Sequence, residues 1–552
     1  MRARTLAGEL RRRALDDPSA DHEVVIRSTD AGDLEGPIAW TSAALWREAE
    51  RVGRALRRRG IGPGDRLLLL SPEVRDGVAA HFGAWAVGAS PIHVGLPYRL
   101  GDIAAYVAQL RATADRVGAS RLLISPTIAA FAGDDPRVLP IAELRGEDEG
   151  APLGDPDALP APDLIQLTSG STGAPRAVVI PHARVIDHLR AIAAALPAGE
   201  RASGVSWLPL YHDMGLIGGL LYPFFTRFPV HLIAAPVFQS RPYGWLEALA
   251  DEGATHTAGP PSAYALMLRL AARARDDRLR LDRLRCAMIG AEPIPPALLR
   301  SFVAAFAPLG LDARAFFPVY GLAEATVAVT FPAPLGALQV ARVDRRALTG
   351  ARRAIEVAAA DEADAIELCG VGRPLPGTEL RIVDEGGVAL AEDRVGEIQV
   401  RAATLMREYL GEPEASAAAL AGGWLRTGDL GFLRDGALFV AGREKDVILK
   451  GGQSLLPGPI EAVAAAVPGV RPGCVVAVGV ADEARCTERV VVVAETRRAA
   501  SEHAALAGAL RDALRLAGVA IDQVVLVAPG WLPRTTSGKH RRREVAERLA
   551  AR

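Results

Sequence analysis

The 552-residue sequence lacks the features that mark several protein classes. Its four cysteines, Cys286, Cys369, Cys474 and Cys486, show no paired CxxC spacing, which argues against a disulfide framework and against a zinc site. No run of eighteen apolar residues is present, so we expect no membrane span. The basic N-terminus lacks the apolar core of a signal peptide and is interpreted as an amphipathic helix. These absences predict a cytoplasmic protein.

Net charge is almost absent as well. The formal net charge is -1, and no basic stripe interleaved with aromatic residues is seen, so we expect no nucleic-acid partner. Short arginine runs at residues 11–13 and 541–543 are interpreted as solvated helix faces. The length predicts several structural units with large cores, which excludes a small binding module.

Hydrophobic patterning predicts an α/β fold. Apolar runs near Leu67, near Leu122 and at residues 164–167 alternate with Ala-rich and Leu-rich stretches of helical period, which is typical of βα units in a largely parallel sheet. From Glu367 onward, β-branched segments separated by turns predict a β-rich subdomain. We place the large N-terminal domain at residues 1–442 and a small α+β domain at 443–552.

A loop rich in glycine and hydroxyl side chains follows the run at 164–167. It reads TSGSTGAPRAVVIPH from residue 168. Backbone N–H groups of such a turn, together with Ser and Thr hydroxyls, suit the oxygens of a phosphate chain, which predicts a nucleotide triphosphate. The stretch matches neither GxxxxGK[ST] nor GxSxG, and by itself it leaves a plain surface turn open. The residues assigned to the loop are Thr168, Ser169, Gly170, Ser171, Thr172, Gly173 and Arg176.

Five further stretches decide between these alternatives. They read SWLPLYHDMGLIGG, GAEPIP, VYGLAEAT, WLRTGDLGFLRDGALFVAGREKDVILKGG and WLPRTTSGKHRRRE, in that order along the chain. Their order and spacing resemble the adenylate-forming superfamily over nearly the whole chain. YHDMGL, AEP and YGLAEAT are most similar to the fatty acyl-AMP ligases. The long segment between YGLAEAT and GVGRPLPG resembles the insertion of those ligases. It is also compatible with a surface loop that does not distinguish one family of the superfamily from another.

The resemblance implies a two-step reaction. A carboxylic acid, ATP and Mg²⁺ would give an acyl-adenylate and pyrophosphate, and the acyl group would then pass to a thiol. Glu324 matches the magnesium-holding glutamate, since hard carboxylate oxygens suit this ion. Lys539 matches the mobile lysine that reaches the carboxylate and the α-phosphate, and Lys445 matches the hinge of the C-terminal domain. His212 matches a residue near the acyl-phosphate region, which we interpret as positioning because no nucleophile elbow is present.

The nucleotide-binding residues are implied in the same way. Tyr320, followed by Gly321, would stack on adenine, Asp429 would accept hydrogen bonds from the ribose hydroxyls, and Arg443 would meet the ribose or phosphates. Each residue also has a plain structural interpretation: Glu324 as an acid at a helix N-terminus, Tyr320 as a core residue, Asp429 as part of an ordinary turn and Lys539 as an exposed lysine. The residues expected to line the adenine pocket with backbone atoms are Gly290, Ala291 and Glu292.

Two departures bear on the acceptor and on the loop. Arg176-Ala177 stands where the superfamily usually has Lys-Gly, and the middle of KGGQSLLPGPIE, residues 450–461, differs from the acyl-AMP ligases. The leading hypothesis is a fatty acyl-AMP ligase that loads an acyl carrier protein. The alternatives are an acyl-CoA or aryl-CoA ligase that uses free coenzyme A, and a non-catalytic ATP or acyl-binding protein. Chain length, an amine acceptor and oligomeric state stay open.

Overall fold

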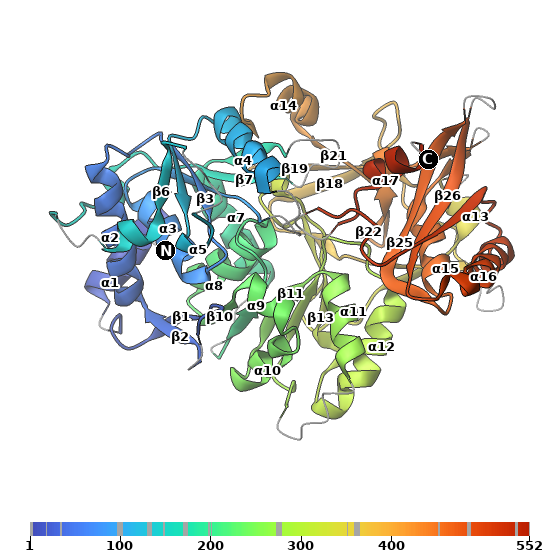
Figure 1. Cartoon of the computed structure of the whole chain (residues 1–552), viewed down its shortest axis with the longest axis horizontal. Helices are drawn as coiled ribbons and strands as arrows, with labels where there is room; N and C mark the ends of the chain where they lie inside the picture. Colours follow the sequence, from blue (N-terminus) through green and yellow to red (C-terminus); the bar gives the residue numbers. More distant parts are fainter. Residues whose placement is uncertain are drawn as a thin grey trace.

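The computed structural model describes most of the chain. The described residues are 4–17, 19–33, 36–96, 103–129, 135–146, 150–168, 175–196, 199, 201–271, 279–349, 352–357, 365–450, 453–482, 487–535 and 539–550. They form a large N-terminal body of several sheets and a small C-terminal domain, drawn in orange and red at the right of Figure 1. The predicted α/β class is therefore confirmed.

Two parallel sheets build the first half of the large domain. In the seven-stranded sheet only the edge strand β2 runs antiparallel to its neighbour. Its order is β13 (Phe316–Pro318), β12 (Cys286–Ile289), β11 (His256–Gly259), β9 (Gly204–Ser206), β10 (Val230–Ile233), β1 (Val24–Thr29), β2 (Ile38–Thr41). The four-stranded sheet is all parallel, in the order β4 (Ser90–His93), β3 (Arg66–Leu70), β5 (Arg121–Ile124), β6 (Val138–Pro140).

Helices follow the strands as expected for βα units. Their buried faces are apolar, and the aromatic core around Trp245, Tyr264 and Phe302 lies under α10 to α12. The principal helices are α1 (Leu6–Asp16), α2 (Ser42–Arg58), α3 (Val74–Ala86), α4 (Ile103–Val117), α7 (His182–Ala195), α10 (Gly244–Asp251), α11 (Pro261–Leu270) and α12 (Pro296–Phe306).

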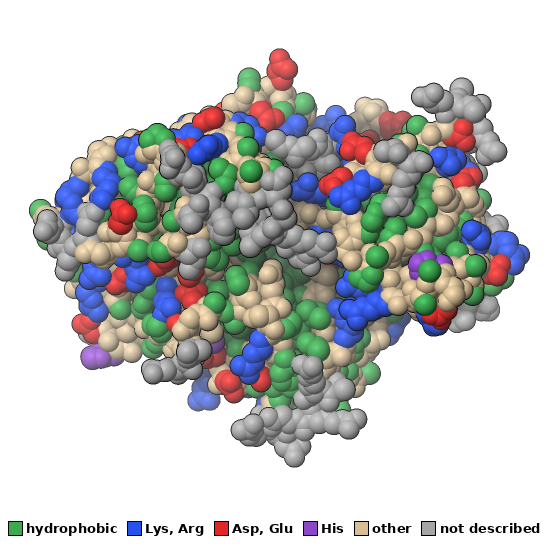
Figure 2. Space-filling view, viewed as in Figure 1, with side chains coloured by type: hydrophobic (Ala, Val, Ile, Leu, Met, Phe, Trp, Pro, Cys, Tyr) green, Lys and Arg blue, Asp and Glu red, His purple; other side chains and the backbone are tan. Residues whose placement is uncertain are grey.

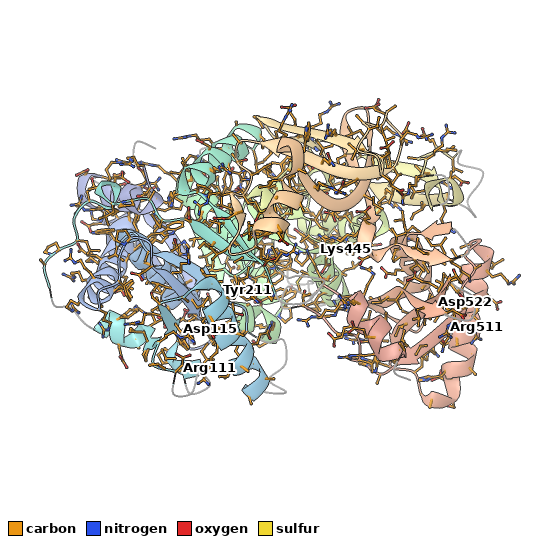
Figure 3. All side chains as sticks on the ribbon, turned by 90° about the horizontal axis from the view of Figure 1, so that it is seen from above. Arg111, Asp115, Tyr211, Lys445, Arg511 and Asp522 are labelled. Atoms are coloured by element: carbon orange, nitrogen blue, oxygen red, sulfur yellow. The ribbon has the colours of Figure 1, made fainter. Side chains whose placement is uncertain are left out.

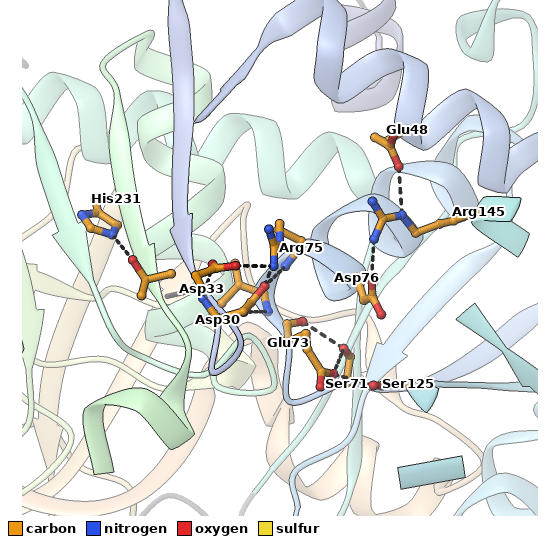
Figure 4. Close-up of polar contacts among 12 residues, drawn as sticks. Asp30, Asp33, Glu48, Ser71, Glu73, Arg75, Asp76, Ser125, Arg145 and His231 are labelled. Carbon is orange, nitrogen blue, oxygen red and sulfur yellow. Dashed lines mark hydrogen bonds and ion pairs between the residues drawn. The ribbon is translucent and has the colours of Figure 1, made fainter. Parts of the chain in front are cut away.

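A polar network fastens the two parallel sheets to each other (Figure 4). Asp30, just after β1, accepts hydrogen bonds from Val74 N at 2.7 Å and from Arg75 Nε at 3.0 Å, at the start of α3. Arg75 also pairs with Asp33, at 2.7 Å. Burial raises the pKa of Asp30, although these donors oppose the shift. The network holds β1 and α3 in a fixed relation.

The run at 164–167 corrects one expectation. It forms β7 (Leu164–Leu167), which pairs antiparallel with β8 (Ala177–Ile180) in a three-stranded sheet with β20 (Glu408–Tyr409), and not with the parallel strands. The glycine-rich loop joins β7 directly to β8. A parallel pairing needs a crossover of a dozen or more residues, usually a helix, so this short connection favours a hairpin.

The arginine runs also differ from the expectation of solvated faces. Arg13 in α1 is only 4% exposed; it pairs with Glu9 at 2.9 Å and donates to Phe224 O at 2.7 Å. Arg542 pairs with Glu461 and Asp446. The helical period turns Arg13 toward the same core as Leu6 and Leu10, and a buried guanidinium requires such partners. Elsewhere, Figure 2 shows acidic, basic and apolar side chains interspersed over the visible described surface.

The expected β-rich subdomain and α+β domain are both present. The antiparallel sheet contains β18 (Thr378–Val383), β19 (Gly396–Ala402), β21 (Leu425–Arg434) and β22 (Ala437–Arg443). The C-terminal domain packs α15 (Pro457–Ala465), α16 (His503–Leu516) and α17 (Arg542–Ala550) on β25 (Val470–Asp482), β26 (Thr487–Thr496) and β27 (Gln523–Val527). No helix within the described ranges is long and apolar enough to cross a membrane.

The long segment after YGLAEAT contacts the C-terminal domain. Its ends pair as β15 (Val340–Asp344) and β16 (Ala365–Cys369), and α13 (Arg345–Thr349) lies beside the C-terminal helices in Figure 1. Arg345 is buried and donates from Nη1 to Ala517 O, just after α16, at 2.5 Å. This segment therefore bridges the two domains.

Candidate functional site

The glycine-rich loop leaves and re-enters the hairpin of β7 and β8 at a closed neck. Thr168 N donates to Arg176 O at 2.8 Å, and Arg176 N donates to Thr168 Oγ1 at 3.2 Å. Ser169, Gly170, Ser171, Thr172 and Gly173 lie outside the described residues, so their assignment stays a prediction. The Arg176 guanidinium pairs with Glu412 at 3.1 Å, with Cζ 5.0 Å from the ring centroid of Tyr409.

The segment after β13 carries Tyr320, Gly321 and Glu324. A Cβ at Gly321 would lie 1.8 Å from Val327 O, so only glycine fits this close approach of two backbones. The Glu324 carboxylate accepts a hydrogen bond from Tyr409 Oη at 2.8 Å. Burial raises the pKa of Glu324, although the Tyr409 hydroxyl and Arg443 oppose the shift. The arrangement presents a hard carboxylate from a rigid turn.

Asp429 gathers two predicted residues around its carboxylate. Tyr320 Oη donates to Oδ2 at 2.8 Å, and Arg443 Nε donates to Oδ1 at 2.7 Å. Asp429 and Arg443 face each other across β21 and β22, which explains how residues 14 positions apart meet. Asp429 raises the pKa of Arg443, so this arginine is a permanent cation. The set offers donors and acceptors for a polyhydroxyl ligand.

Lys539 reaches this cluster from the C-terminal domain. Burial and the charge of Arg443 lower the pKa of Lys539, whereas the charges of Asp213, Asp429 and Glu292 oppose the shift, so its ammonium group lies within the electrostatic influence of all four. The turn that carries it is closed by Thr535 N donating to Lys539 O at 2.8 Å. On either side of the turn, Arg534 and His540 both donate to Gly473 O. The structure therefore brings Lys539 into the electrostatic surroundings of Asp429 and Arg443, and its catalytic role stays a prediction.

His212 pairs with Asp213, which the sequence analysis did not single out. Nδ1 of His212 lies 2.6 Å from Asp213 Oδ1, and Met214 N donates to the same oxygen at 2.7 Å. Burial alone would raise the pKa of Asp213, but His212, Lys539 and the Met214 N–H lower it overall. An acidic residue beside histidine in YHDMG was the only signal for it. The pair gives the imidazole a carboxylate partner, and the charge of Lys539 acts on that carboxylate.

The AEP segment lies at the end of β12. A Cβ on Gly290 would come within 2.9 Å of Val319, and Ala291 adopts a φ of 67°, a conformation costly for a residue with a side chain. The Glu292 carboxylate accepts hydrogen bonds from Ser262 N at 3.0 Å and Ser262 Oγ at 3.1 Å, at the start of α11. Burial raises its pKa despite Ser262, Arg534 and Lys539. Glu292 therefore also anchors a helix terminus.

Lys445 lies apart from the charged cluster. It belongs to a short turn, η8 (Glu444–Asp446), between β22 and the C-terminal domain, and its side chain is exposed. Figure 3 shows it between the large domain and the C-terminal domain in the view from above. Its neighbour Asp446 pairs with Arg542 of α17 at 2.9 Å. This position agrees with a hinge, and that role stays a prediction.

Comparison with known proteins identifies the family. The model of the family described as AMP-binding enzyme matches residues 11–410, which is more than half of the chain. The chain belongs to the AMP-binding enzyme family. This AMP-binding enzyme is 31% identical to the long-chain-fatty-acid–AMP ligase FadD26 of Mycobacterium tuberculosis, over 99% of the chain and 97% of the relative.

Two further relatives agree with this assignment. A putative acyl-CoA synthetase of Caulobacter vibrioides is 35% identical over 90% of this chain and 88% of its own. A solved chain from a study of fatty acyl-adenylate ligases of E. coli and L. pneumophila is 30% identical, with a TM-score of 0.88, covering 99% of this chain and 98% of its own. The resemblance to the fatty acyl-AMP ligases is thereby confirmed.

Two residues of this AMP-binding enzyme were missed in the sequence. Asp213 and Tyr409 both contact predicted site residues, at His212 and Glu324. Tyr409 lies in MREYLGEP, a stretch without charge pattern or glycine spacing that would single it out. Its pairing with Glu324, 85 positions away, depends on how β20 joins β8.

Proposed function

We propose that this enzyme activates a fatty acid with ATP and Mg²⁺ and then loads it onto the phosphopantetheine thiol of an acyl carrier protein. In the first step a carboxylate oxygen attacks the α-phosphorus, the bond from that phosphorus to the bridging oxygen breaks, and pyrophosphate leaves. In the second, the sulfur attacks the acyl carbonyl carbon, AMP leaves with the electrons of the acyl C–O bond, and the thiol proton passes to solvent.

The convergence of Lys539, Arg443 and Asp429 is the observation that supports the first step most strongly. Two anions must meet, and preorganised positive groups reduce that repulsion. Arg443 ends β22 at the junction of the domains, Lys539 lies far along the C-terminal domain, and burial and the charge of Arg443 lower the pKa of Lys539. Asp429, 6% exposed, holds Arg443 in place and would accept hydrogen bonds from the ribose hydroxyls.

Glu324 fits the magnesium ion that the family implies. Magnesium is usually held by one or two carboxylates together with phosphate oxygens and water, so one glutamate suffices. The described ranges contain no group of three or more His, Cys, Asp or Glu that could hold a metal by protein ligands alone. Bound Mg²⁺ would neutralise charge on the phosphates. Glu324 would hold it from the turn in which Gly321 allows the close approach of the backbone to Val327.

An apolar cluster beside the charged site supports an alkyl substrate. Leu208, Met214 and Ala258 form it, with Trp207 and Met288 packed alongside. Met214 follows the His212–Asp213 pair directly, so the apolar and charged surfaces are contiguous in the chain. Since FadD26 is a long-chain-fatty-acid–AMP ligase by name, we assign a fatty acid to this chain also.

Free coenzyme A is the second candidate acceptor. The Caulobacter relative is a putative acyl-CoA synthetase, and residues 450–457 differ from the acyl-AMP ligases.

We keep residues 443–552 as the proposed mobile domain. The cytoplasm is the proposed compartment, since Cys286, Cys369 and Cys474 are free and buried.

Mass spectrometry of paired reactions tests the function. One reaction contains enzyme, ATP, Mg²⁺, mixed carboxylic acids and free coenzyme A; the other replaces coenzyme A with a holo acyl carrier protein. We expect acyl-AMP in both and acyl thioester only with the carrier. Efficient acyl-CoA formation would reverse the acceptor assignment, and the absence of acyl-AMP from every acid would refute adenylation.

A further inference from the structure

The hydroxyl of Tyr409 is directed at the proposed metal-binding carboxylate. Tyr409 is 6% exposed, and its Oη donates to Glu324 Oε1 at 2.8 Å. Three residues before it, Met406 N donates to Glu324 O at 2.8 Å, so one short segment holds both the side chain and the backbone of Glu324. A partner that grips a ligand residue in this way fixes the direction in which the other carboxylate oxygen points.

Tyr409 is itself held by the strand that follows the glycine-rich loop. In β20 it pairs with Val178, and Leu410 N donates to Ala177 O at 2.8 Å. The backbone of Tyr409 is held on its other side as well, because Tyr409 N donates a hydrogen bond to Ser416 Oγ at 2.9 Å. The segment that carries Tyr409 is therefore tied through Leu410 to Ala177, the residue next to Arg176.

Arg176 adds a side-chain connection between the same two strands. Its Cζ lies 5.0 Å from the Tyr409 ring centroid, and its Nε pairs with Glu412 at 3.1 Å. The planar guanidinium can cover an aromatic face and bind a carboxylate together, which an ammonium group does less well. The substitution of arginine at this position, noted above as a departure, thus has a structural partner in Tyr409.

We propose that Tyr409 is a positioning residue for Glu324, and that Arg176 acts through Tyr409. The neck of the glycine-rich loop and the carboxylate that would hold Mg²⁺ then form one mechanical unit. Arg176, at the neck, contacts the ring of Tyr409, and the hydroxyl of that ring orients Glu324. The inference rests on the proposed function, because it assumes that Glu324 holds Mg²⁺.

The test measures binding and needs no turnover. Calorimetry gives the Kd of α,β-methylene-ATP without metal and with saturating Mg²⁺. The metal-free Kd divided by the Kd with Mg²⁺ is the coupling ratio between metal and nucleotide. In Tyr409→Phe we expect the ratio to fall about tenfold, the usual size of such an effect, with the metal-free Kd unchanged. Tyr222→Phe is the matched control, since it also loses a buried hydroxyl, bonded to Leu196 O.

Arg176→Ala should lower the ratio about threefold, because the side chain is 43% exposed and exposed pairs are weak. In the Tyr409→Phe background the same change should have no further effect, since Phe keeps the ring that Arg176 contacts but lacks the hydroxyl through which the ring acts on Glu324. Arg407→Ala is its control: this arginine of the same segment pairs with Asp163. Additive effects in the double variant would contradict the relay.

The outcomes separate the two levels of the proposal. Glu324→Gln, which keeps the shape of the side chain, should bring the ratio of the two Kd values to about 1. If it does and Tyr409→Phe behaves as wild type, the positioning role is refuted and the proposed function stands. If wild type and Glu324→Gln show the same ratio, Glu324 holds no metal. The positioning role of Tyr409 and the magnesium assignment of Glu324 are then both refuted. Should Tyr409→Phe unfold at lower temperature than Tyr222→Phe, Arg176→Ala decides alone, because a half-exposed side chain can be removed without loss of the core.

Discussion

Replacing Lys539 by methionine removes one charge from the junction of the domains while keeping most of the side-chain volume. Lys539 lies close to Asp213, Asp429 and Arg443, in surroundings buried enough to lower its pKa. For a charge about 4 Å from the reacting anions, an effective dielectric constant of roughly 20 gives about 4 kcal/mol. If that interaction forms only in the transition state, adenylation should slow by about 10³-fold.

The assay separates the two half-reactions. Adenylation is followed by pyrophosphate release in single turnover, and transfer is followed by supplying acyl-AMP and a holo carrier protein. We expect Lys539→Met to slow the first by about 10³-fold and to leave the second nearly unchanged. Lys450→Met is the matched control, because its ammonium group pairs with Asp522 within the same domain, at 2.8 Å.

Two results would refute this reasoning. A loss of less than tenfold in pyrophosphate release would show that the Lys539 charge does not stabilise the transition state. An equal loss in both half-reactions would show that the substitution acts on folding or on domain placement, and circular dichroism of the variant would distinguish these.

Three further predictions concern stability and loop placement. Burial lowers the pKa of His182 from 6.5 to about 4, so the unfolded chain takes up a proton at a higher pH than the folded chain does. The contribution of His182 to the free energy of unfolding is therefore complete above pH 6.5 and is lost toward pH 4, by about 2 kcal/mol at pH 5. Urea unfolding should show a shallower loss for His182→Gln, and an unchanged slope would contradict the assignment. Gly321→Ala should cost at least about 3 kcal/mol in the same assay, because its Cβ would strike Val327 O, whereas Gly458→Ala in α15 has open space and should be neutral or stabilising. His540→Ala removes one of the two donors to Gly473 O and should slow adenylation about fivefold but not transfer; equal slowing of both would exclude a specific role in placing Lys539.

Much of the site was predicted from motifs that resemble those of a known family. The motifs named Glu324, Asp429, Arg443 and Lys539, and the structure brings the last three together. The alternation of strand-like and helical segments predicted the two-domain α/β fold, since the period of apolar residues is a local property of each element. Failures arose where two elements had to be paired, as for β7, which is antiparallel, and for Arg13, which is buried.

The sequence by itself determined which residue types stand at each motif, which elements they form and, from the order of the motifs, the family. Only the tertiary structure decided which side chains share a carboxylate: Tyr320 and Arg443 at Asp429, Tyr409 at Glu324, and His212 at Asp213. Most of these contacts depend on strand register and on packing between elements far apart in the chain. No local period encodes them, because a hydrogen bond requires atoms within about 3 Å and a shift of one residue in a strand turns a side chain to the opposite face.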